Sequence, residues 1–117
     1  MLVLAGEACG DHHAAAFAAG LRTRHPGVRM LGTGGPRMAE QGVELLAGLD
    51  QLAVMGFAEV LPRLPFFRRL AAQVLRRMDE DRPALVVLVD YPGFNMRMAR
   101  AAHERGIPVL YYIAPQV

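Results

Sequence analysis

A run of six apolar residues at 84–89 is followed at once by a polar turn. The run reads Ala-Leu-Val-Val-Leu-Val, and the next six residues, 90–95, read Asp-Tyr-Pro-Gly-Phe-Asn. An apolar run of this length, rich in β-branched residues, predicts a strand that is buried on both faces, as in a parallel sheet. Because open α/β sheets bind ligands at the carboxyl ends of their strands, Asp90 is a candidate functional residue. It could act as a general base, orient a sugar hydroxyl or cap the following helix.

The rest of the chain alternates between strand and helix patterns. Strands are expected at 2–5, 28–31, 84–89 and 107–113, with a possible short strand at 43–46. Helices are expected at about 11–24, 37–41, 65–80 and 96–105. This order predicts an α/β fold with a parallel sheet and right-handed crossovers. The absence of repeats and linkers indicates one domain over 1–117, and the short strands at both ends lead us to expect a piece of a larger protein.

Composition argues against several classes of protein. The formal charge of +2 over 117 residues is too small to argue for nucleic-acid binding, and the basic–aromatic pattern of an RNA-binding sheet is absent. No apolar run approaches the roughly 20 residues needed to span a bilayer. The amino terminus lacks the pattern of a secretory signal, so secretion is not expected. The single cysteine, Cys9, excludes an internal disulfide and fits a reducing compartment.

The first glycine-rich loop, 6–11, follows the first expected strand. Its glycines, Gly6 and Gly10, have the spacing G-x-x-x-G, which is neither the dinucleotide fingerprint nor a P-loop. One interpretation is a tight turn in which Asp11 caps the following helix. The other is that the glycines let a ligand approach the backbone, with Glu7 facing the edge of the sheet.

The second glycine-rich loop, 32–38, follows the second expected strand. Its backbone N–H groups at Gly34 and Gly35 could form a nest for an anion beside Arg37, or the loop could be a flexible turn. His12 and His13 are adjacent and would point in different directions on a helix. With no other cluster of His, Cys or Asp at ligand spacing, we predict no metal site.

The segment 57–67 carries more apolar residues than one helix face can bury, and two prolines interrupt it. Between Val60 and Met78, the chain has five arginines and no Asp or Glu. Apolar residues interleaved with arginines predict a patch that enters the headgroup region of an anionic membrane. The alternative is that they pack against a missing part of the protein. The expected membrane-contact residues are Phe57, Val60, Leu61, Leu64 and Phe66.

Five blocks, in order along the chain, resemble the lipid-A-disaccharide synthases. They are Ala-Gly-Glu-Ala-Cys-Gly-Asp at 5–11, Gly-Thr-Gly-Gly-Pro-Arg-Met at 32–38, Leu-Ala-Val-Met-Gly-Phe-Ala-Glu-Val-Leu at 52–61, Asp-Tyr-Pro-Gly-Phe-Asn at 90–95 and Tyr-Ile-Ala-Pro-Gln-Val at 112–117. The third block is the most specific of them. A single glycine-rich loop would be a weak signal, but five blocks spread over the chain make a chance match improbable.

The resemblance implies the amino-terminal, acceptor-side half of a two-domain GT-B glycosyltransferase, with a Rossmann-like parallel sheet flanked by helices. The family transfers diacylglucosamine from UDP-2,3-diacylglucosamine to 2,3-diacylglucosamine 1-phosphate, with inversion and without a metal or other cofactor. The implied location is the cytoplasm, peripherally on the cytoplasmic face of the inner membrane. The implied partners are the two substrates, the anionic membrane surface and a carboxyl-terminal domain that binds UDP, with no nucleic acid.

The resemblance also implies roles for individual residues. Asp90 would be the catalytic base that takes the proton from the primary hydroxyl of the acceptor. The expected substrate-binding residues are Gly6, Glu7, Cys9, Gly10, Asp11, Gly34, Gly35, Met55, Gly56, Glu59 and Asn95. Two positions depart from the family pattern: Cys9 stands where Ser or Thr is usual, and Gly93 replaces a second Asp.

Three alternatives stand beside this interpretation. Another GT-B transferase that uses a UDP-N-acetylhexosamine donor would share the architecture but should lack the block at 52–61. A non-catalytic module that docks on membranes or binds lipid belongs to a different class. A nicotinamide-binding domain is disfavoured by the glycine spacing.

Overall fold

A computed structural model describes residues 1–6, 8–48, 65–89 and 92–112. Five strands form one parallel sheet in the order β3-β2-β1-β4-β5. The strands are β1 (Leu2–Ala5), β2 (Leu31–Gly34), β3 (Glu44–Gly48), β4 (Val86–Val89) and β5 (Val109–Tyr112). The described helices are α1 (Ala8–Arg24), α2 (Pro36–Glu40), α4 (Pro65–Asp81) and α5 (Pro92–Glu104). The expected α/β fold with a Rossmann-like parallel sheet is confirmed.

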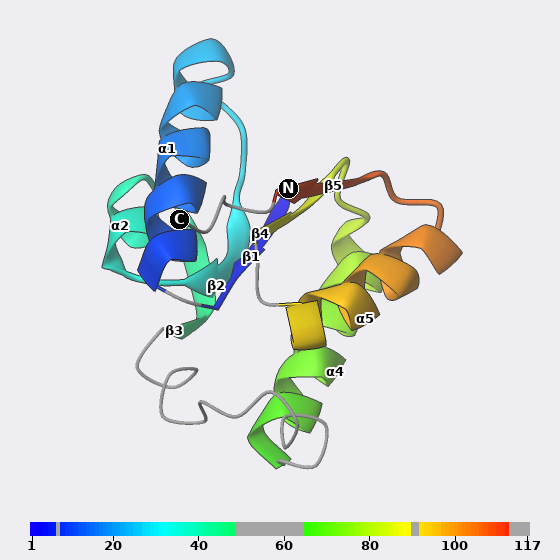
Figure 1. Ribbon diagram of the computed structural model, residues 1–117. Helices are drawn as coiled ribbons and strands as arrows, with labels where there is room; N and C mark the ends of the chain where they lie inside the picture. The colour runs from blue at the N-terminus through cyan, green and yellow to red at the C-terminus, as the bar shows by residue number, and fades with distance from the viewer. Residues whose placement is uncertain (7, 49–64, 90–91, 113–117) are drawn as a thin grey trace.

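Helices cover both faces of the sheet, with α1 and α2 on one face and α4 and α5 on the other (Figure 1). The alternation of side chains along β1 shows how the layers form, because successive residues of a strand point to opposite faces. Leu2 and Leu4 pack in the cluster under α4 and α5, whereas Val3 and Ala5 pack in the cluster under α1 and α2. A strand covered on both faces is apolar throughout, which is why the run at 84–89 was recognisable from sequence.

The long helix α4 has an apolar inward face. Phe67, Leu70, Val74 and Met78 recur at helical spacing, and all four are buried. On α1, Ala14 and Ala18 are buried and Phe17 and Leu21 are half-buried. The small alanines let α1 lie close to the sheet.

Several predicted boundaries are wrong. The second strand, expected at 28–31, spans Leu31–Gly34, because residues that resembled a glycine-rich turn pair with β1. A side chain at Gly32 would overlap the Val3 carbonyl oxygen, so the glycine is required by close packing of the backbones. The helix expected from Met96 begins four residues earlier at Pro92, a position where proline is tolerated. The helix expected from Asp11 begins at Ala8.

Candidate functional site

The candidate site lies at the carboxyl edge of the sheet, where β1, β2 and β4 end. Because the strands are parallel, the segments after Ala5, Gly34 and Val89 all leave the sheet at this edge. The described residues of the two glycine-rich loops and of the motif at 90–95 therefore lie at this edge, as expected for an open α/β sheet.

Asp11 connects the first of these segments to the second. Its side chain is only 3% exposed, and it accepts three backbone hydrogen bonds from the start of α2. Its Oδ1 atom lies 2.9 Å from the Gly35 nitrogen and 3.0 Å from the Met38 nitrogen, and its Oδ2 atom lies 3.2 Å from the Arg37 nitrogen. A carboxylate in this position satisfies donors that have no partner within their own helix.

These hydrogen bonds change the interpretation of both loops. The prediction that Asp11 caps its own helix is wrong, because α1 starts three residues before it and the carboxylate caps α2 instead. The backbone N–H of Gly35, expected to bind an external anion, donates to the carboxylate of Asp11 instead. Gly34 is buried in β2, and a side chain there would overlap the sulfur of Met38. Substrate contact by Asp11, Gly34 and Gly35 stays a prediction beside this structural role.

Asn95 joins the ends of two strands. It lies in the first turns of α5 with 1% exposure, and its Nδ2 atom lies 3.1 Å from the Leu4 carbonyl oxygen and 3.4 Å from that of Val89. Val89 directly precedes Asp90 in the sequence. The buried amide therefore links α5 to the last residue of β4, directly before the candidate base in the sequence.

Gly10 and Thr33 make further contacts at the carboxyl ends of β1 and β4. Gly10 lies where α1 approaches the sheet, and a Cβ atom there would be 3.3 Å from the Ala5 Cβ atom and 3.6 Å from Val89 Cγ1. The hydroxyl of Thr33 donates to the Ala5 carbonyl oxygen at 3.0 Å. Thr33 was not singled out from sequence, because a threonine between two glycines carries no signal of its partner.

The other predicted site residues are described in part. Gly6 follows β1 and is buried, and the backbone of Cys9 lies in α1. Five predicted positions lie outside the described residues: Glu7, Met55, Gly56, Glu59 and Asp90. Their roles stay predictions.

Of the predicted membrane-contact residues, only Phe66 is described, and Phe57, Val60, Leu61 and Leu64 lie outside the described residues. Phe66 is half-buried against the core cluster under α4, with its ring centroid 5.0 Å from that of Phe67. Part of its side chain therefore stabilises the domain itself.

Two arginines of α4 form ion pairs with acids of the same helix. Arg76 pairs with Glu80 at 3.5 Å, and Arg77 pairs with Asp81 at 3.4 Å. These acids follow the arginines by one helical turn, so they lie just beyond the acid-free stretch. The local positive charge expected from the sequence is thus reduced by ion pairs in the carboxyl-terminal part of α4.

The adjacent histidines have separate contacts. Arg37 Nη1 lies 2.6 Å from His12 Nδ1, and the ring of His13 lies 5.3 Å from that of Tyr112 in β5. No group of three His, Cys, Asp or Glu side chains that could hold a metal ion occurs within residues 1–6, 8–48, 65–89 and 92–112.

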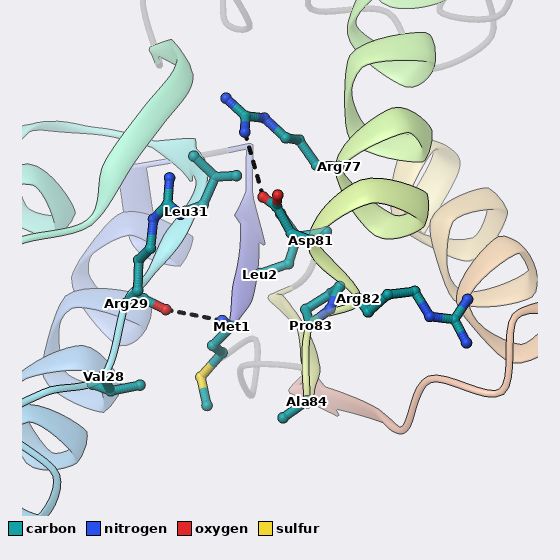
Figure 2. Close-up of a pocket in the computed structure, with 10 residues that line it drawn as sticks. All are labelled: Met1, Leu2, Val28, Arg29, Leu31, Arg77, Asp81, Arg82, Pro83 and Ala84. Carbon is teal, nitrogen blue, oxygen red and sulfur yellow. Dashed lines mark hydrogen bonds and ion pairs between the residues drawn. The ribbon is translucent and has the colours of Figure 1, made fainter.

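A cavity of about 320 Å³ lies at the opposite, amino-terminal edge of the sheet (Figure 2). Met1, Arg29, Arg77 and Asp81 are among its lining residues, and the Met1 ammonium donates to the Arg29 carbonyl oxygen at 2.9 Å. Burial lowers the pKa of this ammonium from its ordinary value of 8.0, and Arg29 adds to the effect while Asp81 opposes it. The cavity is separated from Asp11 and Asn95 by the length of the strands, so it is not part of the candidate site.

The sheet order, the helices on both faces and the loops gathered at the carboxyl edge define a Rossmann-like α/β domain. Among the described helices, none has the length and apolar character needed to cross a membrane. A family model described as lipid-A-disaccharide synthetase matches residues 1–117. The chain therefore belongs to the lipid-A-disaccharide synthetase family.

Curated relatives agree with this assignment. The chain is 44% identical over 117 residues to a lipid-A-disaccharide synthase of Myxococcus xanthus (strain DK1622). This alignment covers all of the chain and 30% of the relative. It has the same identity and coverage with a lipid-A-disaccharide synthase of Anaeromyxobacter sp. (strain K). It is 38% identical over 118 residues to lipid-A-disaccharide synthase 1 of Legionella pneumophila (strain Philadelphia 1), covering 31% of that protein. The chain thus spans about 30% of the length of the curated relatives that it matches.

Proposed function

We propose that this chain is the acceptor-side part of a lipid-A-disaccharide synthase of the GT-B type. The reaction transfers 2,3-diacylglucosamine from its UDP-activated form to 2,3-diacylglucosamine 1-phosphate, in lipid A biosynthesis. The observation that carries the proposal is the family match over all 117 residues, and the named relatives support it. The chain supplies the candidate base, and the remaining length of the relatives has room for a UDP-binding domain.

The proposed chemistry is a single displacement at the anomeric carbon of the donor. The primary hydroxyl of the acceptor attacks this carbon as Asp90 takes its proton, and the bond to UDP breaks with inversion. A positioned carboxylate base contributes about 10²–10⁴-fold to such a step. The described neighbours in the sequence support the assignment, since the buried Asn95 donates to the carbonyl oxygen of Val89, the residue before Asp90.

The proposal includes peripheral binding to the cytoplasmic face of the inner membrane, where acylated substrates reside. Two features support it: the apolar segment 57–64 leads into α4, and Arg68 and Arg69 are exposed on the first turns of that helix. Arginines near an anionic surface and inserted apolar side chains act together in such binding.

The test uses the full-length gene product with both substrates, and it measures formation of the disaccharide and of UDP. The unsubstituted enzyme should form both in equal amounts. Asp90→Asn should lower kcat by about 10²-fold or more with little change in substrate binding. A near-normal rate in this variant would remove Asp90 as the base, and no disaccharide from the unsubstituted enzyme would refute the proposed function.

A further inference from the structure

An apolar groove of about 250 Å³ runs between α4 and α5. The two helices lie side by side on the same face of the sheet (Figure 1). Phe67 from α4 and Phe94 and Met98 from α5 are buried at the groove, with the two phenyl centroids 6.2 Å apart. Ala71 and Leu75 are half-buried and Ala72 is exposed, so these three α4 residues form an open wall.

Two arginines and no acid accompany these apolar residues among the described lining of the groove. Arg68 of α4 and Arg97 of α5 are both exposed at its border. Within the described part of the chain, Arg97 has no hydrogen bond or ion pair with another side chain. The acids of α4 lie at the other end of the helix, where Asp79, Glu80 and Asp81 pair with other arginines. An apolar channel with cationic groups at its border matches an amphiphile that has an alkyl chain and an anionic head.

The position of the groove connects it to the candidate site. Gly93 lines the groove and belongs to the motif at 90–95 that carries Asp90. The α5 residues of the groove lie in the first two turns of that helix, next to the carboxyl edge of the sheet. A ligand in the groove would therefore extend away from the place where the acceptor hydroxyl must react.

We propose that the groove between α4 and α5 holds an acyl chain of the acceptor, with its phosphate placed near Arg97 and Arg68. This inference rests on the proposed function, which supplies the class of substrate. In 2,3-diacylglucosamine 1-phosphate, the phosphate on C1 and the acyl group on C2 are on neighbouring carbons. A single placement of the sugar can therefore bring the phosphate to the arginines and the acyl chain into the groove. The reacting hydroxyl on C6 lies on the other side of the sugar ring. Burial of apolar chain and charge pairing at the border then act on the same molecule.

The first experiment measures binding of dodecyl phosphate, below its critical micelle concentration, to the full-length gene product by isothermal titration calorimetry. Ala72→Phe fills the open wall of the groove and should weaken binding by about tenfold. Ala39→Phe adds the same side chain at an exposed position of α2, outside the groove, and should leave the dissociation constant unchanged. Thermal melts of both variants report whether the fold is retained, and Ala72→Glu provides a second block of the groove.

The second comparison isolates the charge. Arg97→Gln should weaken dodecyl phosphate binding by about threefold to tenfold, with a larger effect at low salt. Arg100→Gln removes an exposed arginine from the same helix outside the groove and should have no effect. In the synthase assay, Ala72→Phe should raise KM for the acceptor and leave kcat nearly unchanged, because an acyl chain takes no part in the reacting bonds and binds equally in the ground state and the transition state.

Four results would overturn the inference. The first is unchanged dodecyl phosphate binding in both Ala72→Phe and Arg97→Gln, and the second is binding of inorganic phosphate as tight as that of dodecyl phosphate. The third is binding to anionic vesicles without binding to dodecyl phosphate monomers. The fourth is a change of self-association in Ala72→Phe while dodecyl phosphate binding stays intact. The proposed function fails separately, through the absence of disaccharide formation. Groove-dependent dodecyl phosphate binding in a protein without synthase activity would support the alkyl-phosphate groove and refute the synthase.

Discussion

The side-chain amide of Asn95 donates a hydrogen bond to the carbonyl oxygen of Leu4, a residue 91 positions earlier in the chain. The same nitrogen lies 3.4 Å from the carbonyl oxygen of Val89. One buried amide thus joins β1, β4 and α5 at the edge of the sheet where the candidate site is built. This arrangement gives Asn95 a structural role that is measurable apart from any contact with substrate.

Replacing Asn95 with alanine should lower the free energy of unfolding by about 1–3 kcal/mol, because two buried carbonyl oxygens lose a donor. Urea denaturation measures the difference. Met96→Ala, on the same helix but 58% exposed, is the matched control and should change stability by less than about 0.5 kcal/mol. Equal stability of the two variants would show that the amide is not needed for the fold.

Asp11→Ala should destabilise the domain by about 2–3 kcal/mol, because three backbone N–H groups at the start of α2 lose their acceptor. Asp11→Asn should be less severe, since an amide can retain the two bonds made by Oδ1 but not the one made by Oδ2. Arg24→Ala, at an exposed position at the end of α1, serves as the control. Hydrogen exchange at the amides of Gly35 and Met38 should speed up in Asp11→Ala, and unchanged exchange would argue against the cap.

Two residues after helix ends have opposite expected responses to substitution. Arg82 follows α4 with φ 46° and Gly106 follows α5 with φ 70°, both in the left-handed region. Gly106→Ala should cost about 1 kcal/mol, whereas Arg82→Gly should be neutral or stabilise by up to about 1 kcal/mol. Thermal melts compare them directly, and a gain of stability from Gly106→Ala would contradict the backbone argument.

The ion pair between α4 and the end of α5 predicts a pH dependence. Arg105 Nε lies 2.7 Å from Asp79 Oδ1, and this hydrogen bond lowers the pKa of Asp79 below its ordinary value of 3.8 despite an opposing contribution from desolvation. A lowered folded-state pKa means that the stabilisation is complete above pH 3.8 and is lost as the pH falls through the folded pKa. Urea midpoints measured from about pH 5 to about pH 2 should fall less steeply in Asp79→Asn than in the unsubstituted chain. Parallel curves for the two proteins would contradict the coupling.

The membrane proposal is tested with three serine substitutions, at Val60, Leu61 and Leu64. If these side chains face lipid, the triple variant should bind anionic vesicles more weakly and keep its melting temperature. Phe66→Ser is examined separately, because its half-buried ring packs on the core and its loss should cost about 1–2 kcal/mol. Vesicle sedimentation at low and high salt reports the binding, and unchanged sedimentation of the triple variant would refute membrane docking by this segment.

Local sequence patterns determined the fold class and much of the helical core. The apolar run before Asp90 was recognisable because a strand covered on both faces has no polar side. The buried face of α4 was recognisable because Phe67, Leu70, Val74 and Met78 repeat at the period of a helix. Each of these signals is contained within one continuous segment of the sequence. The resemblance to the synthases added the candidate base and its neighbours.

Only the tertiary structure decided where the polar residues of the site point. Asp11 had the sequence pattern of a cap for its own helix, but its hydrogen-bond partners lie 24 and 27 residues further on, in a segment brought close by strand pairing. Gly32 and Gly34 resembled a turn, yet they lie in β2, where the Val3 backbone and Met38 occupy the space that side chains would need. Sequence spacing carries local periodicity, whereas long-range partners depend on the order β3-β2-β1-β4-β5, which no single segment encodes.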